Sequence, residues 1–316
     1  MAAKTLLIAC DFAINDRDVP MDIPKQIARL VQEACIREAC APKPGNVNRK
    51  HDFSDTSLED FLVSAVAIGH AFENAARVSV GQIIRQATKD CRRHVRSNTN
   101  LGIILLLAPL VKASLAAVEN SEAGGRANAG KVREFLHAVL QSLTVGDTRL
   151  VYAAIRAANP GGLSRVPEQD VHEEPSVTLL EAMQLAGNRD SVASEYVSEF
   201  EITYSIGLPA LGEALSEGIN FSDAVVQAFL TILSRVPDTL IARKNGAETA
   251  GQVSRRAEEV LAQGGIYSSR GRENILELDR ALRDPSHKLN PGTTADLTAA
   301  AVFLALLEKE PFEKSP

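Results

Sequence analysis

The chain has 316 residues, of which 45% are hydrophobic and 23% are charged, a composition typical of a globular protein with one large domain or two. Its 34 basic and 40 acidic side chains give a formal net charge of −6, so no general basic surface for nucleic acid is expected. The chain has no tryptophan and only 4% aromatic residues, which also argues against a platform for stacked bases.

No C-x-x-C pair occurs among the four cysteines, which are Cys10, Cys35, Cys40 and Cys91. This spacing favours small buried thiols over a zinc site, a redox dithiol or a disulfide framework, and it indicates a reducing, cytoplasmic compartment. The apolar segments 5–10 and 101–111 are too short to span a membrane, so we expect no membrane partner.

Apolar residues recur at spacings of three and four along most of the chain, whereas strand-like alternation is rare. The pattern predicts an all-α protein, and the run LGIILLLAPLV at 101–111 predicts a central buried helix. Clusters of Gly, Pro and Asn separate the helical segments. The predicted helices cover about 27–36, 56–76, 79–95, 98–118, 128–142, 145–158, 176–188, 190–204, 206–217, 221–235, 247–263, 270–283 and 293–309.

No internal repeat and no linker rich in Pro or Ser interrupts this pattern, which favours a single globular domain over 1–316. We expect its core to span about 25–309, with 1–20 and 311–316 at the periphery. Any active site would then be built from the loops between helices. An Ala-rich helical surface would suit a homodimer, although the sequence singles out no face for it.

The first such loop is APKPGNVNRKHDFSDTSLEDF, from Ala41 to Phe61. Its prolines and Gly45 shape a turn, and a helix is expected to resume near Asp55 or Thr56. Two carboxylates three residues apart, Asp52 and Asp55, would suit Mg²⁺, which keeps several waters and bridges to substrate phosphates. The alternatives are that the loop is only solvated and that Asp55 is only a helix cap.

Two further loops combine helix-capping residues with extra polar groups. SNTNLG opens the most apolar helix, and its surplus of Asn98, Thr99 and Asn100 would hold a ribose or a phosphate beyond what capping requires. In the segment 146–171, Asp147 begins a helix that NPGG ends, and a polar loop with Arg165 follows. Capping and a plain helix stop explain part of each pattern, so both interpretations stay open.

The last two loops also mix capping with candidate phosphate binding. In RVPDTLIARKNG, Asp238 caps a short helix that closes on Arg243 and Lys244, which would either satisfy the helix dipole or bind a triphosphate. In LNPGTTADL, the NPG turn leads into a helix start. Thr293 or Thr294 as cap and Asp296 in the first turn are ordinary capping chemistry, and free amides there would also bind a phosphate.

Other common catalytic signatures are missing from the sequence. The six histidines are scattered and do not form an H-E-x-x-H helix, and no G-x-S-x-G, Walker or G-x-G-x-x-G motif occurs. A metalloprotease, a serine hydrolase, a P-loop protein and a Rossmann dehydrogenase are therefore disfavoured.

In order and spacing, these loops resemble the triphosphoribosyl-dephospho-coenzyme A synthase family over roughly residues 25–309. The resemblance rests on PKPG followed by N, H and D-x-x-D, on the TNxG helix start, on the DT segment, and on the closing N-P-G-x-x-A-D-L. Members of that family are all-helical transferases. They use ATP and dephospho-coenzyme A to make the precursor of a lyase prosthetic group, and they release adenine.

The sequence departs from that family at two places. It has PGNVNR, with Asn46 and Asn48, where the enzymes carry PGLVDR, and ANPGGLSRVPEQDV stands where they have an arginine-glycine-glutamate stretch. This version resembles the branch that accompanies tetrahydromethanopterin biosynthesis in methanogens and methylotrophs. The resemblance therefore leaves open a second reaction, phosphoribosyl transfer to a different alcohol acceptor, with ATP or phosphoribosyl pyrophosphate as donor.

The family reaction is a displacement at an anomeric carbon, and it suggests a role for each loop. Asp52 and Asp55 would bind Mg²⁺ or stabilise the cationic transition state, and Asp147 or Asp238 would be the base. The remaining candidates would bind substrate and phosphate, and they are Lys43, Gly45, Arg49, Asn98, Thr99, Asn100, Arg165, Arg243, Lys244, Gly292 and Thr293. Two other outcomes are a helical nucleotide-binding protein without catalysis and a hydrolase of the same glycosidic bond.

Overall fold

The computed structural model describes residues 22–121, 127–161, 165–310 and 312, and it confirms the all-α prediction. These residues contain no β-strand, only an isolated bridge between Asn48 and His51. The α-helices are α1 (Ile23–Cys40), α2 (Leu58–Ala67), α3 (Gly69–Glu73), α4 (Val80–His94), α5 (Leu101–Glu119), α6 (Ala129–Gln141), α7 (Val145–Ala158), α8 (Leu179–Ala186), α9 (Ser191–Val197), α10 (Leu208–Ser216), α11 (Phe221–Arg235), α12 (Thr239–Asn245), α13 (Ala247–Ala262), α14 (Ser269–Leu282) and α15 (Gly292–Lys309). Short helical turns η1 (Ala75–Arg77), η2 (Thr203–Gly207) and η3 (Gly265–Tyr267) join some of them.

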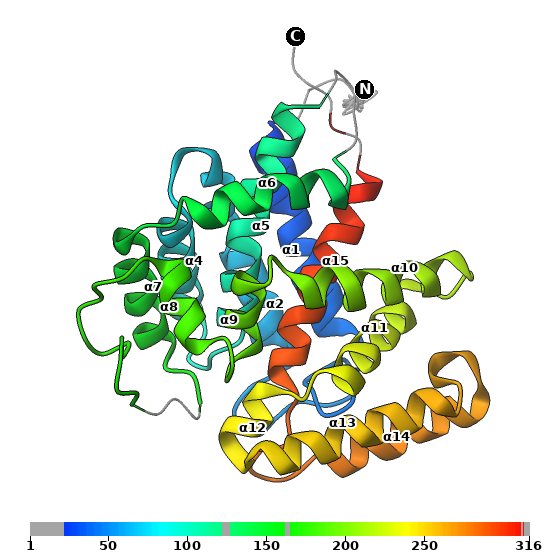
Figure 1. Ribbon diagram of the computed structural model, residues 1–316. Helices are drawn as coiled ribbons and strands as arrows, with labels where there is room; N and C mark the ends of the chain where they lie inside the picture. The colour runs from blue at the N-terminus through cyan, green and yellow to red at the C-terminus, as the bar shows by residue number, and fades with distance from the viewer. Residues whose placement is uncertain (1–21, 122–126, 162–164, 311, 313–316) are drawn as a thin grey trace, which may run out of the picture.

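Helices α1, α5 and α15 pack against one another at the centre of the protein (Figure 1). The predicted central helix is α5, which is long and apolar enough to cross a membrane by length and composition. However, 83% of its apolar window is buried inside the protein, as expected for a core helix. Helix α15 is also buried along most of its length.

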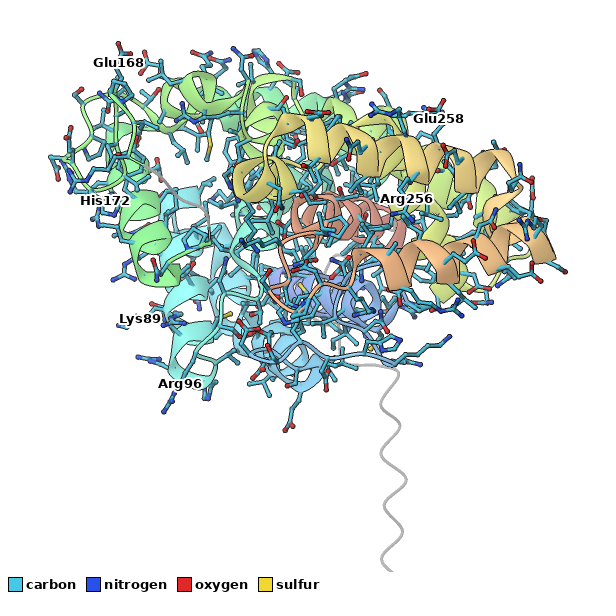
Figure 2. The ribbon with its side chains drawn as sticks, turned by 90° about the horizontal axis from the view of Figure 1, so that it is seen from below. Lys89, Arg96, Glu168, His172, Arg256 and Glu258 are labelled. Carbon is cyan, nitrogen blue, oxygen red and sulfur yellow. The ribbon has the colours of Figure 1, made fainter. Side chains whose placement is uncertain are left out.

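Two groups of helices flank this centre (Figure 1). On one side α4 packs against α7, with α8 beside them, and on the other side α11 packs against α10 and α13, with α14 beside α13. The exposed side chains of Lys89, Arg96, Glu168 and His172 lie along the α4–α7 side in the view from below (Figure 2). The core that joins both groups is a single hydrophobic cluster.

Several helices begin where side chains cap them. Ser57 with Asp60, Ser79 with Gln82, and Thr178 with Glu181 form capping boxes at the starts of α2, α4 and α8. Helix α2 therefore begins at Leu58 with Ser57 as its cap, and the expected start at Asp55 or Thr56 is corrected by two to three residues.

The predicted helix over 190–204 is interrupted. Helix α9 ends at Val197, and Glu199 and Phe200 adopt positive φ angles of 53° and 64°. The buried carboxylate of Glu195 accepts hydrogen bonds from the amides of Ile202 and Thr203, at 2.8 and 3.0 Å. This side chain replaces the backbone acceptors that a continuous helix would supply, which accounts for the break.

The ends of the chain and the cysteines fit the expectations in part. Residues 1–20, 311 and 313–316 lie outside the described residues. Phe312 is 1% exposed and belongs to the core, so the expectation that it is peripheral is wrong. Cys35 and Cys91 are buried free thiols and Cys40 is free and partly buried, whereas Cys10 is not among the described residues. Burial raises the pKa of Cys91 to about 12.

Asp147 joins α7 to α4. One carboxylate oxygen accepts hydrogen bonds from the Oγ of Ser79 and the amide of Gly81, at 2.5 and 2.9 Å. The other accepts from the amide and hydroxyl of Thr144, at 2.9 and 2.7 Å. Burial raises the pKa of Asp147, but these hydrogen bonds outweigh it and lower the pKa overall.

We expect Asp147→Asn to lower the free energy of unfolding by about 2 kcal/mol at pH 7. The amide nitrogen of asparagine would face N–H and O–H groups that now donate hydrogen bonds to the carboxylate. The pKa is lowered in the folded state, so this stabilisation is present above about pH 4 and is lost as the pH falls through the folded value. Urea unfolding of both proteins between pH 3 and pH 7 measures it.

A matched control is Glu181→Gln, which alters a capping box that is exposed and joins no second helix. It should change stability much less than Asp147→Asn does. Equal losses from the two variants would show that Asp147 acts only as a local cap.

Candidate active site

A cavity of about 640 Å³ lies where the ends of many helices meet, and all five loops identified in the sequence reach it. The starts of α5, α9 and α15 and the ends of α1, α4 and α7 contribute to its wall, together with α8 and α12. The sequence analysis expects an active site built from these loops, and such a site requires that they meet at one cavity.

The cavity separates the predicted site residues into two groups. The first group lines it and consists of Lys43, Asp55, Asn98, Thr99, Arg243, Lys244, Gly292 and Thr293. The second group does not line it and consists of Gly45, Arg49, Asp52, Asn100, Asp147, Arg165 and Asp238.

The carboxylates of the second group are bound to helix starts. Asp52 is exposed and accepts a hydrogen bond from the amide of Leu58 at 2.7 Å. Asp238 is buried, and it accepts from the amides of Ile241 and Thr294 at 2.9 and 2.8 Å, which ties α12 to α15. Together with the bonds of Asp147, this geometry argues against Asp147 or Asp238 as the base, because neither reaches the cavity and both have their acceptors filled.

The other members of the second group support the loops or lie on the surface. The amide of Gly45, at a φ of 77°, donates to Asp279 at 2.9 Å and holds the first loop against α14. Arg49 and Arg165 are exposed away from the cavity wall. Asn100 is buried, and its side-chain nitrogen has no hydrogen-bond partner among the described residues.

Lys43 lines the cavity but is only 1% exposed, and its ammonium is fully engaged. It forms an ion pair with Glu38 at 2.9 Å and donates to the backbone carbonyls of Glu38 and Ala41. An ammonium has three donors, so none is left for a phosphate. The structure therefore indicates that Lys43 orients Glu38. The sequence analysis did not single out Glu38 as a site residue. Burial raises the pKa of Glu38 despite this pair.

Basic residues gather around α12 and the start of α9. Arg243 forms an ion pair with Asp190, whose other oxygen caps α9 through the amide of Val192 at 2.9 Å. Lys244 donates to the carbonyl of His287 at 3.3 Å, and burial followed by the charge of Arg243 lowers its pKa. Arg189 also lines the cavity. Arg189 and Asp190 were not predicted, and their only sequence signal is their position just before a helix.

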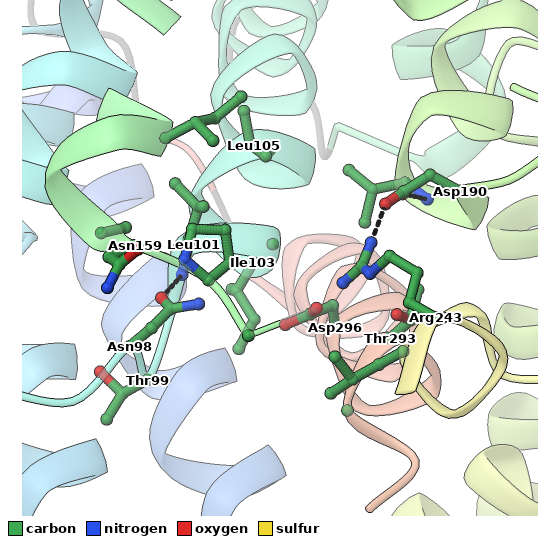
Figure 3. A pocket seen from close by; sticks show the side chains of 18 of the residues that line it. Asn98, Thr99, Leu101, Ile103, Leu105, Asn159, Asp190, Arg243, Thr293 and Asp296 are labelled. Carbon is green, nitrogen blue, oxygen red and sulfur yellow. Dashed lines mark hydrogen bonds and ion pairs between the residues drawn. The ribbon is translucent and has the colours of Figure 1, made fainter. Parts of the chain in front are cut away.

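Asp296 is the most distinctive carboxylate on the cavity wall, and sequence reasoning assigned it only to capping. The expected position in the first turn is wrong, because Asp296 is the fifth residue of α15 and no acid lies in that first turn. Its side chain points toward the start of α5, while Arg243 points toward Asp190 (Figure 3). A Cβ atom on Gly102 would lie 2.1 Å from the Oδ2 of Asp296, so only glycine permits this approach. Among the described residues, Asp296 forms no hydrogen bond or ion pair, in contrast to Asp147 and Asp238.

The starts of α5 and α15 both reach the cavity through Gly102 and Gly292. Neither helix has a side-chain hydrogen bond from its own cap residue, although Asn98 accepts from the amide of Leu101 and Asp238 accepts from that of Thr294. Such helix starts favour anionic groups. The hydroxyl of Thr99 pairs with Ser64 at 2.7 Å, so Thr99 is partly committed to packing.

Another part of the cavity wall is apolar. Side chains of α7, α8 and α5 form it, and they include Val151, Ile155, Leu179, Met183 and Leu105. Two buried polar atoms on the cavity loops, the Oδ1 of Asn46 and the Oγ of Ser97, have no partner within the described chain. An elongated ligand with both apolar and hydrogen-bonding parts would satisfy this combination.

A metal site made of protein ligands alone is not found in the described residues, since no three His, Cys, Asp or Glu side chains cluster suitably. Mg²⁺ does not need such a cluster, because one or two carboxylates and substrate phosphates often hold it. Asp55 is exposed at the cavity, and its charge is one of several that partly oppose the lowering of the pKa of Lys244 by burial and Arg243. Asp55 thus fits the predicted metal site better than Asp52 does.

The buried pair of Lys43 and Glu38 can be tested by its effect on stability. Lys43→Met should lower the free energy of unfolding by about 3 kcal/mol, because it leaves a buried carboxyl group without its partner. The double variant Lys43→Met/Glu38→Leu should recover most of the loss in urea unfolding. A Lys43→Met protein of normal stability that has lost only nucleotide affinity would instead support phosphate binding by Lys43.

Comparison with known proteins gives one family. Residues 24–314 match the CitG family, described as ATP:dephospho-CoA triphosphoribosyl transferase. The chain is 25% identical over 315 residues to a protein from Pseudomonas fluorescens, covering 94% of this chain and 97% of that one, and 26% identical over 307 residues to one from Malonomonas rubra, covering 91% and 89%. Both are described as candidate 2-(5''-triphosphoribosyl)-3'-dephosphocoenzyme-A synthases.

A solved structure agrees with this result. A candidate triphosphoribosyl-dephospho-CoA synthase from Archaeoglobus fulgidus superimposes with a TM-score of 0.61 at 29% identity, covering 80% of this chain and 99% of that one. The loop motifs, the helical fold and the sequence match lead to the same conclusion: the chain belongs to the triphosphoribosyl-dephospho-CoA synthase family and is a transferase.

Proposed function

We propose that this transferase moves the 5-triphosphoribosyl group of ATP to a ribose hydroxyl of dephospho-coenzyme A and releases adenine. The bond between the anomeric carbon and adenine breaks, and a bond from that carbon to the acceptor oxygen forms. The names of the family and of its relatives support this pair of substrates.

The single observation that carries the proposal is the two-sided cavity. Its polar side brings together Arg243, Lys244, Asp55 and the start of α15, which suit a triphosphate. Its apolar side, formed by α7 and α8, suits an adenine base or the pantetheine arm of the acceptor. One cavity thereby offers complementary surfaces to both parts of a nucleotide.

Magnesium would strengthen the polar side. Asp55 would hold it together with water and the triphosphate, and the ion would supply charge neutralisation at the phosphates. The protein residues would hold the ribose so that its anomeric carbon faces the acceptor hydroxyl. Asn98 and Thr99 line the cavity at the start of α5, and they would contribute to that task.

A chromatographic assay of purified protein tests the reaction. We expect adenine to appear from ATP with Mg²⁺ only when dephospho-coenzyme A is also present, and in equal amount to the coupled product. Adenine released without acceptor would indicate hydrolysis. Nucleotide binding without any release would indicate a binding protein.

The same assay separates the alternative donor and acceptor. Pyrophosphate released from phosphoribosyl pyrophosphate in the presence of a ribitol-type alcohol, with no turnover of dephospho-coenzyme A, would favour the tetrahydromethanopterin-type reaction. Coenzyme A, which carries an additional phosphate next to the acceptor hydroxyl, serves as the matched control for acceptor recognition.

We expect Asp55→Asn to raise the Mg²⁺ concentration needed for half-maximal adenine release by about tenfold, because the metal loses its protein carboxylate. Glu59→Gln is the control, since Glu59 is an exposed acid at the start of α2 that does not line the cavity. An unchanged Mg²⁺ requirement in Asp55→Asn would contradict the assignment.

A further inference from the structure

We infer that Asp296 is the general acid of the reaction, and that it donates a proton to the adenine ring as the bond to the ribose breaks. The inference rests on the proposed function, since it names the group that assists departure of the base. It assigns a catalytic residue that the sequence motif alone suggested only as part of a helix cap.

The position of Asp296 is fixed by two buried helices. It lies one turn into α15, and its carboxyl group rests on the bare Cα of Gly102 in the first turn of α5. Neighbouring Thr294 is held by Asp238 through both its amide and its hydroxyl, at 2.8 and 2.9 Å. The start of α15 is therefore tied to the start of α12, and Asp296, two residues further on, presents its carboxyl group to the cavity.

The lack of partners distinguishes Asp296 from a structural cap. Asp147 accepts four hydrogen bonds and Asp238 accepts three, whereas Asp296 accepts none among the described residues. A cap for α5 would have to accept a hydrogen bond from an amide of that helix, and the structure shows no such bond. A carboxyl group that faces a cavity with its hydrogen-bonding capacity unused is available to a ligand.

The surroundings of Asp296 favour its protonated form. The groups that face it are Glu38 and Cys35 on α1, Asp238 at the start of α12, Asp190 at the start of α9, and Arg243 on α12. Removal from bulk water, followed by the charges of Glu38, Asp238 and Asp190, raises the pKa of Asp296 well above its usual value. Arg243 opposes this shift, but its guanidinium is paired with Asp190.

The proposed step breaks one bond and forms another at the anomeric carbon. The electron pair of the breaking carbon–nitrogen bond goes to adenine, and the proton of Asp296 goes to a ring nitrogen of the base. The acceptor oxygen forms its bond to the anomeric carbon and loses its proton to water. Solvent then returns a proton to Asp296 before the next turnover, so no further reactant is required. Protonation of a leaving base is a usual task for a carboxyl group with a raised pKa.

The first test is the pH dependence of turnover. Wild-type kcat for adenine release should fall as the pH rises through the pKa of Asp296, because the acid is then ionised. Asp296→Asn should lower kcat by about 10² to 10⁴-fold, change the KM for ATP by only a few-fold, and lack this alkaline decline. Asp296→Glu should restore part of kcat.

Three results would overturn the inference. The first is an Asp296→Asn enzyme with more than a tenth of wild-type kcat, and the second is an alkaline decline of kcat that persists in that variant. The third is a wild-type kcat that falls at low pH instead, which would indicate that Asp296 acts in its ionised form. Thermal unfolding and ATP binding of the variant show whether it remains folded. If the wild-type protein releases no adenine, the proposed function fails independently of Asp296.

A second variant tests the geometry without changing the acid. In Gly102→Ala the new methyl group would have to displace the carboxyl group of Asp296, so kcat should fall at least tenfold while the protein stays folded. Gly212→Ala in α10 is the matched control, because nothing lies within 4 Å of the added atom, and it should keep full activity. Full activity in Gly102→Ala would contradict the proposed position of Asp296.

Discussion

The site depends on the burial of α5 and α15 side by side at the centre of the protein. Both helices are packed along nearly their whole length, so only their ends are free for polar chemistry. The first turn of α5 meets α15 near its start, where the carboxyl group of Asp296 lies against Gly102. The two sequence motifs, SNTNLG and NPGTTAD, are thus the polar starts of two core helices, and packing of the apolar parts brings these starts to one cavity.

Carboxylates near helix starts serve two purposes in this protein. Asp147 and Asp238 tie neighbouring helices together, and all their bonds are made within the protein. Asp296 also lies near the start of its helix, as its fifth residue, but it faces the cavity without a partner among the described residues. Sequence position cannot separate these cases, since each is an acid close to a helix start. The separation comes from tertiary contacts, which decide whether an acceptor meets an amide or a ligand.

The sequence was sufficient to predict the helical fold, the buried helix α5 and the loops that form the cavity, because these follow from apolar periodicity and from residues that stop helices. It did not predict the break after Val197, which a side chain of Glu195 causes, or the start of α2 at Leu58. The engagement of Lys43 by Glu38 was also missed. Each of these depends on a side chain that competes with, or replaces, a backbone or ligand contact.

The charges on the cavity wall explain why the proposed protonated Asp296 and the proposed Mg²⁺ would suit the same site. Two of the basic residues, Lys43 and Arg243, are already paired with Glu38 and Asp190, so they neutralise acids of the protein before they meet a substrate. A bound triphosphate would add several negative charges to this nearly balanced surface, and ionised Asp296 would add one more. A proton on Asp296 and Mg²⁺ at the phosphates would both relieve that repulsion. The negative charge of a bound triphosphate would therefore favour the protonated form of Asp296, which is the form that the proposed acid requires.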